Sequence, residues 1–467
     1  MKQLTSLAVA LILVTSVKAN ITLPSIIGSN MVLQQKSSVK FWGWGNPGER
    51  VVVATSWSSG VDSTIVTANA DWQLSLNTPS AGGPHTITIR GYNKIVLENV
   101  LIGEVWVCSG QSNMEYNYNW GVPQMGAELA GASNLNLRFF HIPRTTARTP
   151  QDQVNAAWVA CDSNSLKSFS AVGYFFGKKL NSELNVPIGL INASWGGTPA
   201  EVWTPSEEIE KSEVLKKAAL QLKPSEGWPI TPGYTFNGMI APVVRFDIAG
   251  AIWYQGESNT ETASTYHPLF STMITSWRKA WEKDFPFYFV QLAPFRYGNK
   301  NIGALLREAQ GQTLSVPRTG MVVTTDLAED TLDIHPKNKR DVGLRLAAIA
   351  LNDTYGRPSA LRSPFFKSWT TNKGRVILTF NNPGTGLVVK GKGLQGLYVA
   401  GVDGRFYAAE GKVEKGQVIA WSKKVPEPAA VRYAFSNTAV GNLFSTEGLP
   451  LSPFRTDTWA VDTSAEQ

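Results

Sequence analysis

The chain has 467 residues, of which 43% are hydrophobic and 17% are charged. This composition supplies enough apolar material for two or three domains with separate cores and excludes an intrinsically disordered protein. Lys and Arg are dispersed and form no basic run despite a formal net charge of +7, which argues against nucleic acid as a partner.

Residues 1–19 have the pattern of a cleavable signal peptide. Lys2 precedes a short apolar run, and "VKA" precedes Asn20. We expect the mature chain to begin near Asn20, with an uncleaved N-terminal anchor as the alternative. No later stretch has the apolar length of a membrane helix, so we expect no membrane span after the signal is removed. The signal-peptide pattern predicts export to the periplasm or the extracellular medium.

Residues 20–100 read as a small β domain. Short β-branched or aromatic runs, such as "SVKFWGWG", "ERVVVATSW" and "HTITIRGYN", are separated by the turn sequences "NPGE" and "SAGGP". This spacing predicts an N-terminal β-sandwich.

In residues 101–357 the pattern changes from short strand-like runs to alternating strands and helices. Strand-like runs such as "EVWVC", "VPIGLINAS", "IAGAIWYQ" and "TGMVVTTD" alternate with segments of helical period. This alternation predicts an α/β domain with a parallel sheet covered by helices on both faces. Helices are predicted over residues 172–184, 206–222, 263–283, 303–314 and 338–351. Residues 358–467 return to β composition and should form a C-terminal β-rich domain.

The two cysteines, Cys108 and Cys161, are expected to be free and buried. Cys108 lies in an apolar run, and a chain of this size does not need a disulfide. With neither a CxxC pair nor clustered histidines, the sequence predicts no metal site.

Three polar clusters follow predicted strands of the α/β domain, namely residues 110–113 (GQSN), 192–198 (NASWGGT) and 255–259 (QGESN). Ligands of open α/β sheets bind at the carboxyl ends of the strands, so these clusters are candidate site segments. Ser112 stands at a turn from strand to helix, which suits a nucleophile whose own N–H faces an oxyanion. The alternative is an ordinary helix N-cap.

His335 is the best placed of the four histidines to activate a serine. It lies in a loop between a strand and a helix, with Asp330 and Asp333 nearby. A neutral imidazole with a carboxylate partner is what serine activation requires. The alternative is a surface histidine that only titrates.

An oxyanion also needs hydrogen-bond donors. Gly196 and Gly197 offer backbone N–H groups, while Gln255 and Asn259 offer side-chain amides. The alternatives are that the glycines form a simple turn and that "QGESN" is an ordinary helix start.

Four segments, "GEVWVCSGQSNM", "LINASWGGTPAEVW", "FNGMIAPVVRFDIAGAIWYQGESN" and "DIHPKNKRDVGLRLA", together resemble the sialate O-acetylesterase family, a branch of the SGNH hydrolases. "WGWGNPGE" is similar to the small β domain that precedes the esterase domain in such proteins. The resemblance implies an SGNH-like parallel sheet flanked by helices, with an N-terminal β-sandwich and a C-terminal β-rich domain.

The resemblance further implies that Ser112 is the nucleophile and His335 the general base. It places the oxyanion at the Ser112 N–H, at Gly197 and at an amide, for which we choose Gln255, with Asn259 as the alternative. The wider superfamily places its Asp three residues before the His, where this chain has Leu332. Asp333, two residues before His335, is the candidate acid, and a Ser–His dyad is the alternative.

The substrate implied by the resemblance is an O-acetylated sugar or glycan, with O-acetylated sialic acid favoured over an acetylated plant polysaccharide such as xylan or xyloglucan. Hydrolysis of this kind requires no cofactor. A lipase or thioesterase is disfavoured, and a non-catalytic carbohydrate-binding protein would lack Ser112 or His335. The residues predicted to bind substrate are Asn113, Trp195, Glu257 and Asn259, with Glu115, Tyr116 and Trp120 on the rim. The oligomeric state stays open, and so does the choice between Arg296 and Arg307 as partner of a sialate carboxylate.

Overall fold

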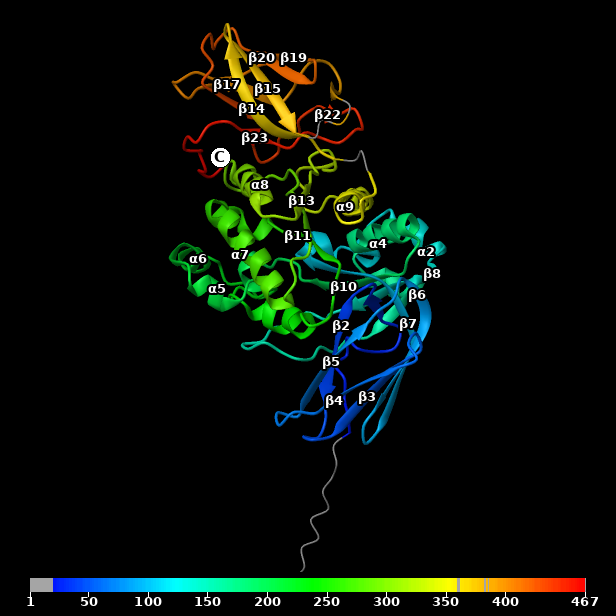
Figure 1. Ribbon diagram of the computed structural model, residues 1–467. Coiled ribbons are helices and arrows are strands. Elements are labelled where there is room, and N and C mark those ends of the chain that lie inside the picture. Colours follow the sequence, from blue (N-terminus) through cyan, green and yellow to red (C-terminus); the bar gives the residue numbers. More distant parts are fainter. Residues whose placement is uncertain (1–19, 359–361, 382–383, 385, 467) are drawn as a thin grey trace, which may run out of the picture.

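The computed structural model describes residues 20–358, 362–381, 384 and 386–466. The predicted signal peptide, residues 1–19, lies outside them. Three parts follow one another along the chain: a β part near the N-terminus, an α/β part and a C-terminal β part. The α/β part lies between the other two (Figure 1).

The central sheet has the strand order β13-β12-β11-β7-β10-β8-β9. Its neighbouring strands are parallel except at the edge, where β9 runs antiparallel to β8. The chain between β8 and β9 forms no helix that would carry it back for a parallel crossover, so the sheet is mixed. The strands are β7 (Lys94–Gly110), β8 (Ser133–His141), β9 (Trp158–Asp162), β10 (Ile188–Ser194), β11 (Gly250–Tyr254), β12 (Phe287–Val290) and β13 (Thr319–Val322).

The two faces of the sheet bury alternate residues of the same strands. On β7, Val105 and Val107 belong to one core cluster, while Trp106 and Cys108 belong to the other. The first cluster includes α7 (Ala263–Trp281) and α8 (Ile302–Gln312), and the second includes α4 (Ala171–Leu184) and α9 (Lys339–Asp353). Figure 1 shows these two pairs of helices on opposite sides of the sheet. Burial on both faces explains why the strands read as continuous apolar runs.

Four of the five predicted helices correspond to α4, α7, α8 and α9, with ends that differ by one or two residues. The helix predicted over residues 206–222 is instead two helices, because the Ser212 side chain accepts a hydrogen bond from Leu215 N and caps a new helix. The other helices are α1 (Ser112–Glu115), α2 (Met125–Ala130), α3 (Ser163–Ser168), α5 (Ser206–Glu210) and α6 (Glu213–Ala219). Short 3-10 or π turns cover Tyr118–Trp120, Ala200–Trp203, Phe236–Ile240, Ala241–Val243, Glu257–Thr262 and Thr313–Ser315.

The N-terminal β part shares strand β7 with the central sheet. The first half of β7 pairs with β6, and its second half pairs with β10 and β11. The predicted domain boundary at residues 100 and 101 therefore falls inside one continuous strand. The other strands here are β1 (Val32–Gln34), β2 (Ser38–Trp44), β3 (Arg50–Thr55), β4 (Val61–Ile65), β5 (Asp71–Asn77) and β6 (Gly82–Arg90).

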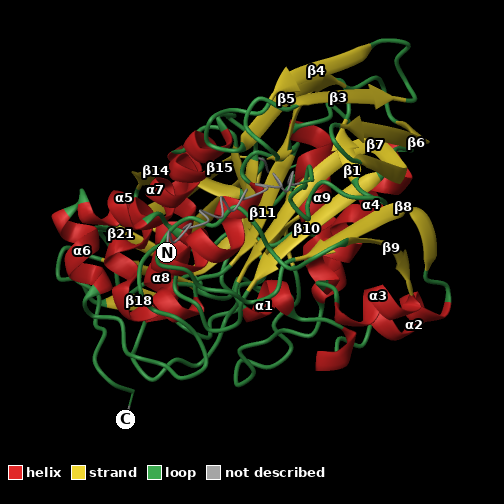
Figure 2. Cartoon of the chain, turned by 90° about the horizontal axis from the view of Figure 1, so that it is seen from below, coloured by secondary structure: helices red, strands yellow, loops and turns green. Residues whose placement is uncertain are grey.

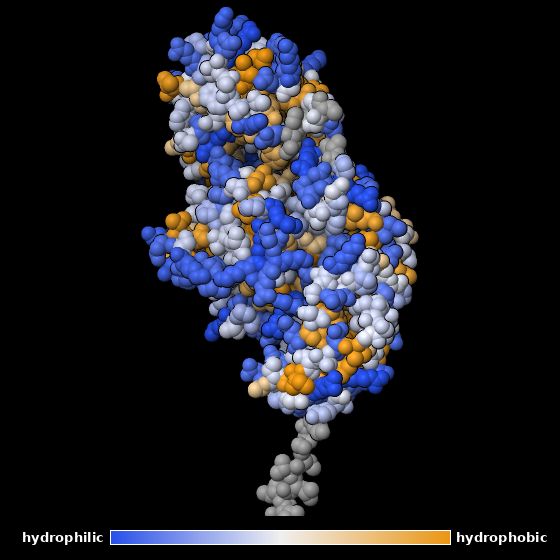
Figure 3. Space-filling view, in the orientation of Figure 1, coloured by the Kyte–Doolittle hydropathy of each residue, from blue (hydrophilic) through white to orange (hydrophobic). Residues whose placement is uncertain are grey.

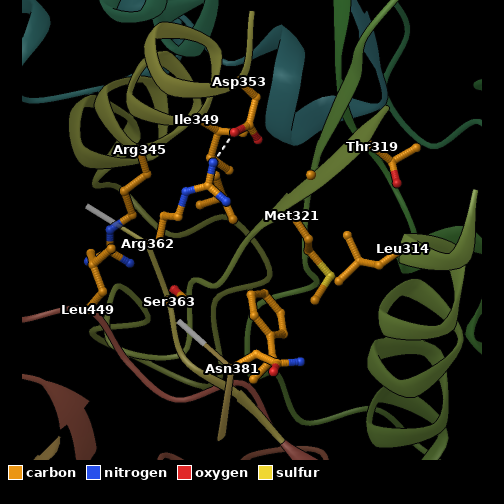
Figure 4. A pocket seen from close by; sticks show the side chains of 13 residues that line it. Leu314, Thr319, Met321, Arg345, Ile349, Asp353, Arg362, Ser363, Asn381 and Leu449 are labelled. Atoms are coloured by element: carbon orange, nitrogen blue, oxygen red, sulfur yellow. Dashed lines mark hydrogen bonds and ion pairs between the residues drawn. The ribbon is translucent and has the colours of Figure 1, made fainter. Parts of the chain in front are cut away.

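The C-terminal β part has a hydrophobic core of its own. It is tied to α8 by Arg455, whose Nε lies 2.7 Å from Glu308 Oε1. A pocket at this junction is lined by Met321 of β13, Arg345 of α9 and Arg362, which pairs with Asp353 (Figure 4). The strands are β14 (Phe365–Asn372), β15 (Arg375–Asn381), β16 (Leu387–Val389), β17 (Leu397–Ala400), β18 (Phe406–Ala408), β19 (Glu410–Glu414), β20 (Gln417–Trp421), β21 (Ala430–Tyr433), β22 (Leu443–Ser445) and β23 (Phe454–Arg455).

Within the residues that the structure describes, no helix combines the length and the apolar character needed to cross a bilayer. On the face shown in Figure 3, apolar residues form small separate groups among hydrophilic ones. The two cysteines are free and buried, as predicted.

Candidate active site

The three polar clusters meet at one edge of the sheet. Gly110, the last residue of β7, pairs with Ser194 at the end of β10 and with Tyr254 at the end of β11. Gly110 has φ +135°, and a Cβ there would collide with the carbonyl of Tyr254. Only glycine therefore lets the chain turn at this point. Figure 2 shows the short helix α1, which begins at Ser112, below the ends of these strands.

Ser112 is the first residue of α1 and not its N-cap. The N-cap position belongs to Gln111, and no side chain caps this helix. The Ser112 hydroxyl instead lies 2.9 Å from His335 Nε2, across 223 positions of sequence. The structure thus brings together the two residues on which the predicted chemistry depends.

His335 is held against Tyr116, whose ring stacks on the imidazole with centroids 4.6 Å apart and an interplanar angle of 23°. Burial lowers the pKa of His335 from its ordinary value, and the Lys339 ammonium lowers it further, although the Asp333 carboxylate opposes both. The imidazole is therefore neutral at neutral pH and can accept a proton from Ser112.

Asp333 lies beside His335 but is not hydrogen-bonded to its ring. Asp333 Oδ1 is 3.9 Å from His335 Nδ1, beyond hydrogen-bond distance, and accepts instead the His335 backbone N–H at 2.9 Å. Lys337 Nζ holds the other carboxylate oxygen at 3.2 Å. The observed arrangement is a Ser–His pair with a nearby carboxylate, which favours the dyad over a hydrogen-bonded triad.

The glycine turn after β10 lies against the serine. A Cβ built on Gly196 would be 3.3 Å from the Cβ of Ser112. The Gly196 N–H already donates to Glu115 Oε2 at 2.8 Å, and both Glu115 oxygens also accept hydrogen bonds from Arg144. Glu115 therefore orders this turn and does not lie free on the rim. Among the described residues, the N–H groups of Ser112 and Gly197 donate to no protein acceptor, so both are candidates to bind an oxyanion.

Gln255 and Asn259 do not fit the predicted role of oxyanion donor. Both are fully buried. Gln255 Nε2 donates to Thr198 O at 3.2 Å and to Asn259 Oδ1 at 2.8 Å. Asn259 Nδ2 donates to Glu201 Oε2 at 2.8 Å. Because these amide hydrogens are committed to protein acceptors, the two side chains brace the turns after β10 and β11.

Asn113 lies below the surface and does not reach substrate, contrary to the prediction, whereas Glu257 is 8% exposed and lines a groove beside the glycine turn. Asn113 is fully buried, and its side-chain amide donates to Glu257 Oε1 and to Ile334 O. Its Oδ1 accepts a hydrogen bond from Lys339 Nζ. The sequence analysis missed Lys339, because helical period alone gave no sign that a lysine at the start of α9 is buried.

The chain matches the family model described as "carbohydrate esterase, sialic acid-specific acetylesterase" over residues 102–352, more than half of its length. The chain belongs to this family. The sialate O-acetylesterases of Homo sapiens and Pongo abelii are each 30% identical to it over 371 residues, which cover 71% of this chain and 71% of each relative. The match confirms that the chain is a carboxylic ester hydrolase.

A solved member of the same fold supports the whole architecture. The crystal structure of a carbohydrate acetylesterase from Xanthomonas citri is 35% identical, with a TM-score of 0.86 over 94% of this chain and 100% of that one. The predicted fold class, a helix-flanked sheet with β-rich parts before and after it, is confirmed for this esterase.

Aromatic side chains of the esterase surround the serine turn. Trp195 is partly exposed, and its indole N–H donates to Gly227 O at 3.3 Å. Trp228, which the sequence analysis did not single out, lies so close to Gly197 that a Cβ there would collide with its indole. Trp120 is 40% exposed, and the Arg144 guanidinium lies 5.7 Å from its ring centroid. These rings give the site apolar surfaces of the kind that sugar rings contact.

Proposed function

We propose that this chain is an exported serine esterase that removes O-acetyl groups from sugars with Ser112 as nucleophile and His335 as general base. The single observation that carries the assignment is the 2.9 Å contact between Ser112 Oγ and His335 Nε2 at the carboxyl edge of the sheet. The membership of the chain in a family of carbohydrate acetylesterases supports the acetyl ester as the bond that is cleaved.

The proposed reaction has two steps. Ser112 Oγ attacks the acetyl carbonyl carbon while His335 Nε2 takes the serine proton, and the N–H groups of Ser112 and Gly197 hold the oxyanion. The sugar oxygen leaves with the proton from His335, and an acetyl-serine remains. His335 then takes a proton from water, the resulting hydroxide attacks the acetyl-serine, and acetate leaves as Ser112 recovers its proton.

We propose O-acetylated sialic acid as the first substrate to test, because the human relative is a sialate O-acetylesterase. Of the two arginines considered for the sialate carboxylate, Arg307 is fully buried and donates to the carbonyls of Ser436 and Asn437, so it is structural. Arg296 is exposed, and its backbone N–H donates to Thr331 O at 2.8 Å in the loop that carries His335. Arg296 is thus the candidate partner.

An acetylated polysaccharide is the second candidate, favoured by a groove that begins beside the glycine turn. The groove has a volume of about 240 Å³ and is lined by Trp228, Ser258 and Lys223, among others. A second depression shares Lys223 and residues 260–262 with it and continues toward α8. A groove that leads away from the glycine turn suits a chain of sugars more than a single sugar.

The deciding experiment measures acetate released from O-acetylated sialic acid and from acetylated xylan by the wild type, Ser112→Ala and Arg296→Ala. Loss of release with Ser112→Ala supports the proposed nucleophile, and equal rates overturn it. A rise in KM for sialate but not xylan with Arg296→Ala supports the first substrate. Faster release from xylan with no effect of Arg296→Ala supports the second.

The export of the chain rests on the pattern of residues 1–19. Expression of the full chain in a bacterial host with N-terminal sequencing of the periplasmic and extracellular fractions tests it. A mature N-terminus near Asn20 supports cleavage. An intact N-terminus on membranes points to the anchor instead.

A further inference from the structure

A buried polar cluster lies behind the Ser–His pair and has no place in the reaction described above. Lys339 and Asn113 are fully buried, and Glu257 is 8% exposed. The Asn113 amide stands between the two side chains, with its oxygen toward Lys339 Nζ and its NH₂ toward Glu257 Oε1. This orientation aligns the amide dipole with both side chains. Burial raises the pKa of Glu257, and the Asn113 hydrogen bond and Lys339 oppose that shift.

The cluster joins the segments that carry the chemistry. Asn113 follows Ser112 in the turn after β7, Glu257 belongs to the turn after β11, and Lys339 begins α9 just beyond the His335 loop. The second N–H of the Asn113 amide donates to Ile334 O at 3.1 Å, at the residue directly before His335. One side chain thus fixes the serine turn relative to the histidine.

Two ammonium groups face the same aromatic ring that stacks on His335. Lys339 Nζ lies 5.2 Å and Lys337 Nζ 5.4 Å from the centroid of Tyr116. Their surroundings differ, since the Lys337 side chain is 38% exposed and pairs with Asp333, whereas Lys339 is buried. A buried charge acts on a neighbour through less water and is screened less than an exposed one.

The charged and titratable groups around this pair come from several elements. Around His335 they are Ser112, Tyr116, Asp333, Lys337 and Lys339. Around Lys339 they are Tyr116, Tyr254, Glu257, Asp333 and Lys337. Burial lowers the pKa of Lys339 to about 7, with Glu257 opposing the shift. Because His335 titrates below its ordinary value, Lys339 is protonated over the acidic range in which His335 gains its proton.

We propose that Lys339 is a positioning residue for His335. Through the Asn113 amide it locks the histidine loop to the serine turn, and its buried charge keeps the imidazole in its basic form at mildly acidic pH. This inference rests on the proposed function, because it assigns a role within the same Ser–His site. It adds that Lys339, a buried residue that contacts no substrate, determines the pH at which kcat/KM falls on the acid side.

The main test replaces both buried charges at once, with Lys339→Met and Glu257→Gln in one variant. Removal of both partners of a buried pair is often tolerated, whereas removal of one leaves an uncompensated charge. Gln at position 257 retains an acceptor for the Asn113 amide. We measure kcat/KM for p-nitrophenyl acetate across pH and titrate the His335 ring by NMR in the same proteins.

Relative to Glu257→Gln alone, the acid limb of the neutral variant should move to higher pH by about 0.5 to 1 unit, which lowers kcat/KM about 3- to 10-fold on the acidic flank relative to its value at alkaline pH. The matched control is Lys337→Met, which removes an exposed ammonium at nearly the same distance from Tyr116. The acid limb of Lys337→Met should move by less than that of the neutral variant. Lys339→Gln, which keeps an N–H donor, provides a second variant with the same expected direction.

A neutral variant that loses the same factor at every pH, with an unmoved His335 titration, overturns the inference and leaves Lys339 a purely structural residue. The NMR titration needs no substrate, so this result is separate from failure of the proposed function. That failure would appear as a wild type with no esterase activity, or as a Ser112→Ala variant as active as the wild type.

Discussion

The turn after β7 and the turn after β11 have similar sequences, since each ends a buried strand with glycine, glutamine, serine and asparagine. Their hydrogen bonds differ. In the first turn the Ser112 hydroxyl faces His335, and the Ser112 N–H has no protein acceptor among the described residues. In the second, Gln255 and Asn259 are saturated by internal partners. The comparison shows that the first turn leaves polar groups open for the proposed chemistry, while the polar groups of the second are used to hold the structure.

Ser112→Ala is the sharpest way to test the reacting turn. The variant should lose about 10³-fold or more in kcat, because the oxyanion donors and binding surfaces alone cannot replace the nucleophile. The melting temperature should stay near that of the wild type, because the Ser112 hydroxyl does not cap helix α1. Stopped assays of acetate release with matched thermal melts provide the measurement, and a variant that keeps most of its rate contradicts the assignment.

Asn259→Ala tests the holding turn. The change leaves Glu201 and the Gln255 amide without their buried partner, so the free energy of unfolding should fall by about 2 to 4 kcal/mol. The kcat of the folded fraction should fall by less than about tenfold. Urea unfolding and activity per folded molecule separate the two effects. A loss of about 10²- to 10³-fold in kcat with unchanged stability would return Asn259 to the oxyanion site.

The Asp333→Asn variant tests whether this carboxylate acts with Ser112 and His335 as a catalytic triad. Asn retains the acceptor for the His335 N–H, while its lost charge no longer raises the pKa of His335. The histidine then loses its proton at lower pH, so the acid limb of kcat/KM should move downward. At neutral pH the rate should fall by less than about tenfold, whereas a loss near 10⁴-fold indicates a working triad. A pH profile of ester hydrolysis gives both quantities.

Trp228→Ala has the smallest expected effect. If the indole beside Gly197 supports a sugar, KM for an acetylated polysaccharide should rise by about 3- to 10-fold. Hydrolysis of p-nitrophenyl acetate, which has no sugar, should stay within about twofold of the wild type. Equal losses for both substrates point to a distorted glycine turn instead.

The sequence was sufficient to predict where the chemistry gathers. Apolar runs identified the strands, and the polar residues directly after them identified the shared edge where Ser112 and His335 meet. The break in the helix predicted over residues 206–222 was harder to foresee, because Ser212 caps a new helix within a segment whose apolar spacing continues.

The roles of the amide side chains were not accessible from the sequence. The partners of Gln255 and Asn259 include Thr198 and Glu201, which lie almost sixty positions away. The sequence alone does not distinguish a glutamine whose amide is open to substrate from one whose amide donates to a distant backbone carbonyl. For the same reason Lys339 read as an ordinary residue of a helix start, whereas the packing of three turns encloses it.

Strand β7 ends two residues before Ser112, the proposed nucleophile, and its first half pairs with the N-terminal sheet. A chain that begins at residue 101 would therefore start in the middle of the strand that leads to Ser112. Because the first half of β7 pairs with β6, loss of the N-terminal β part would remove pairing partners from the same strand that positions the Ser112 turn.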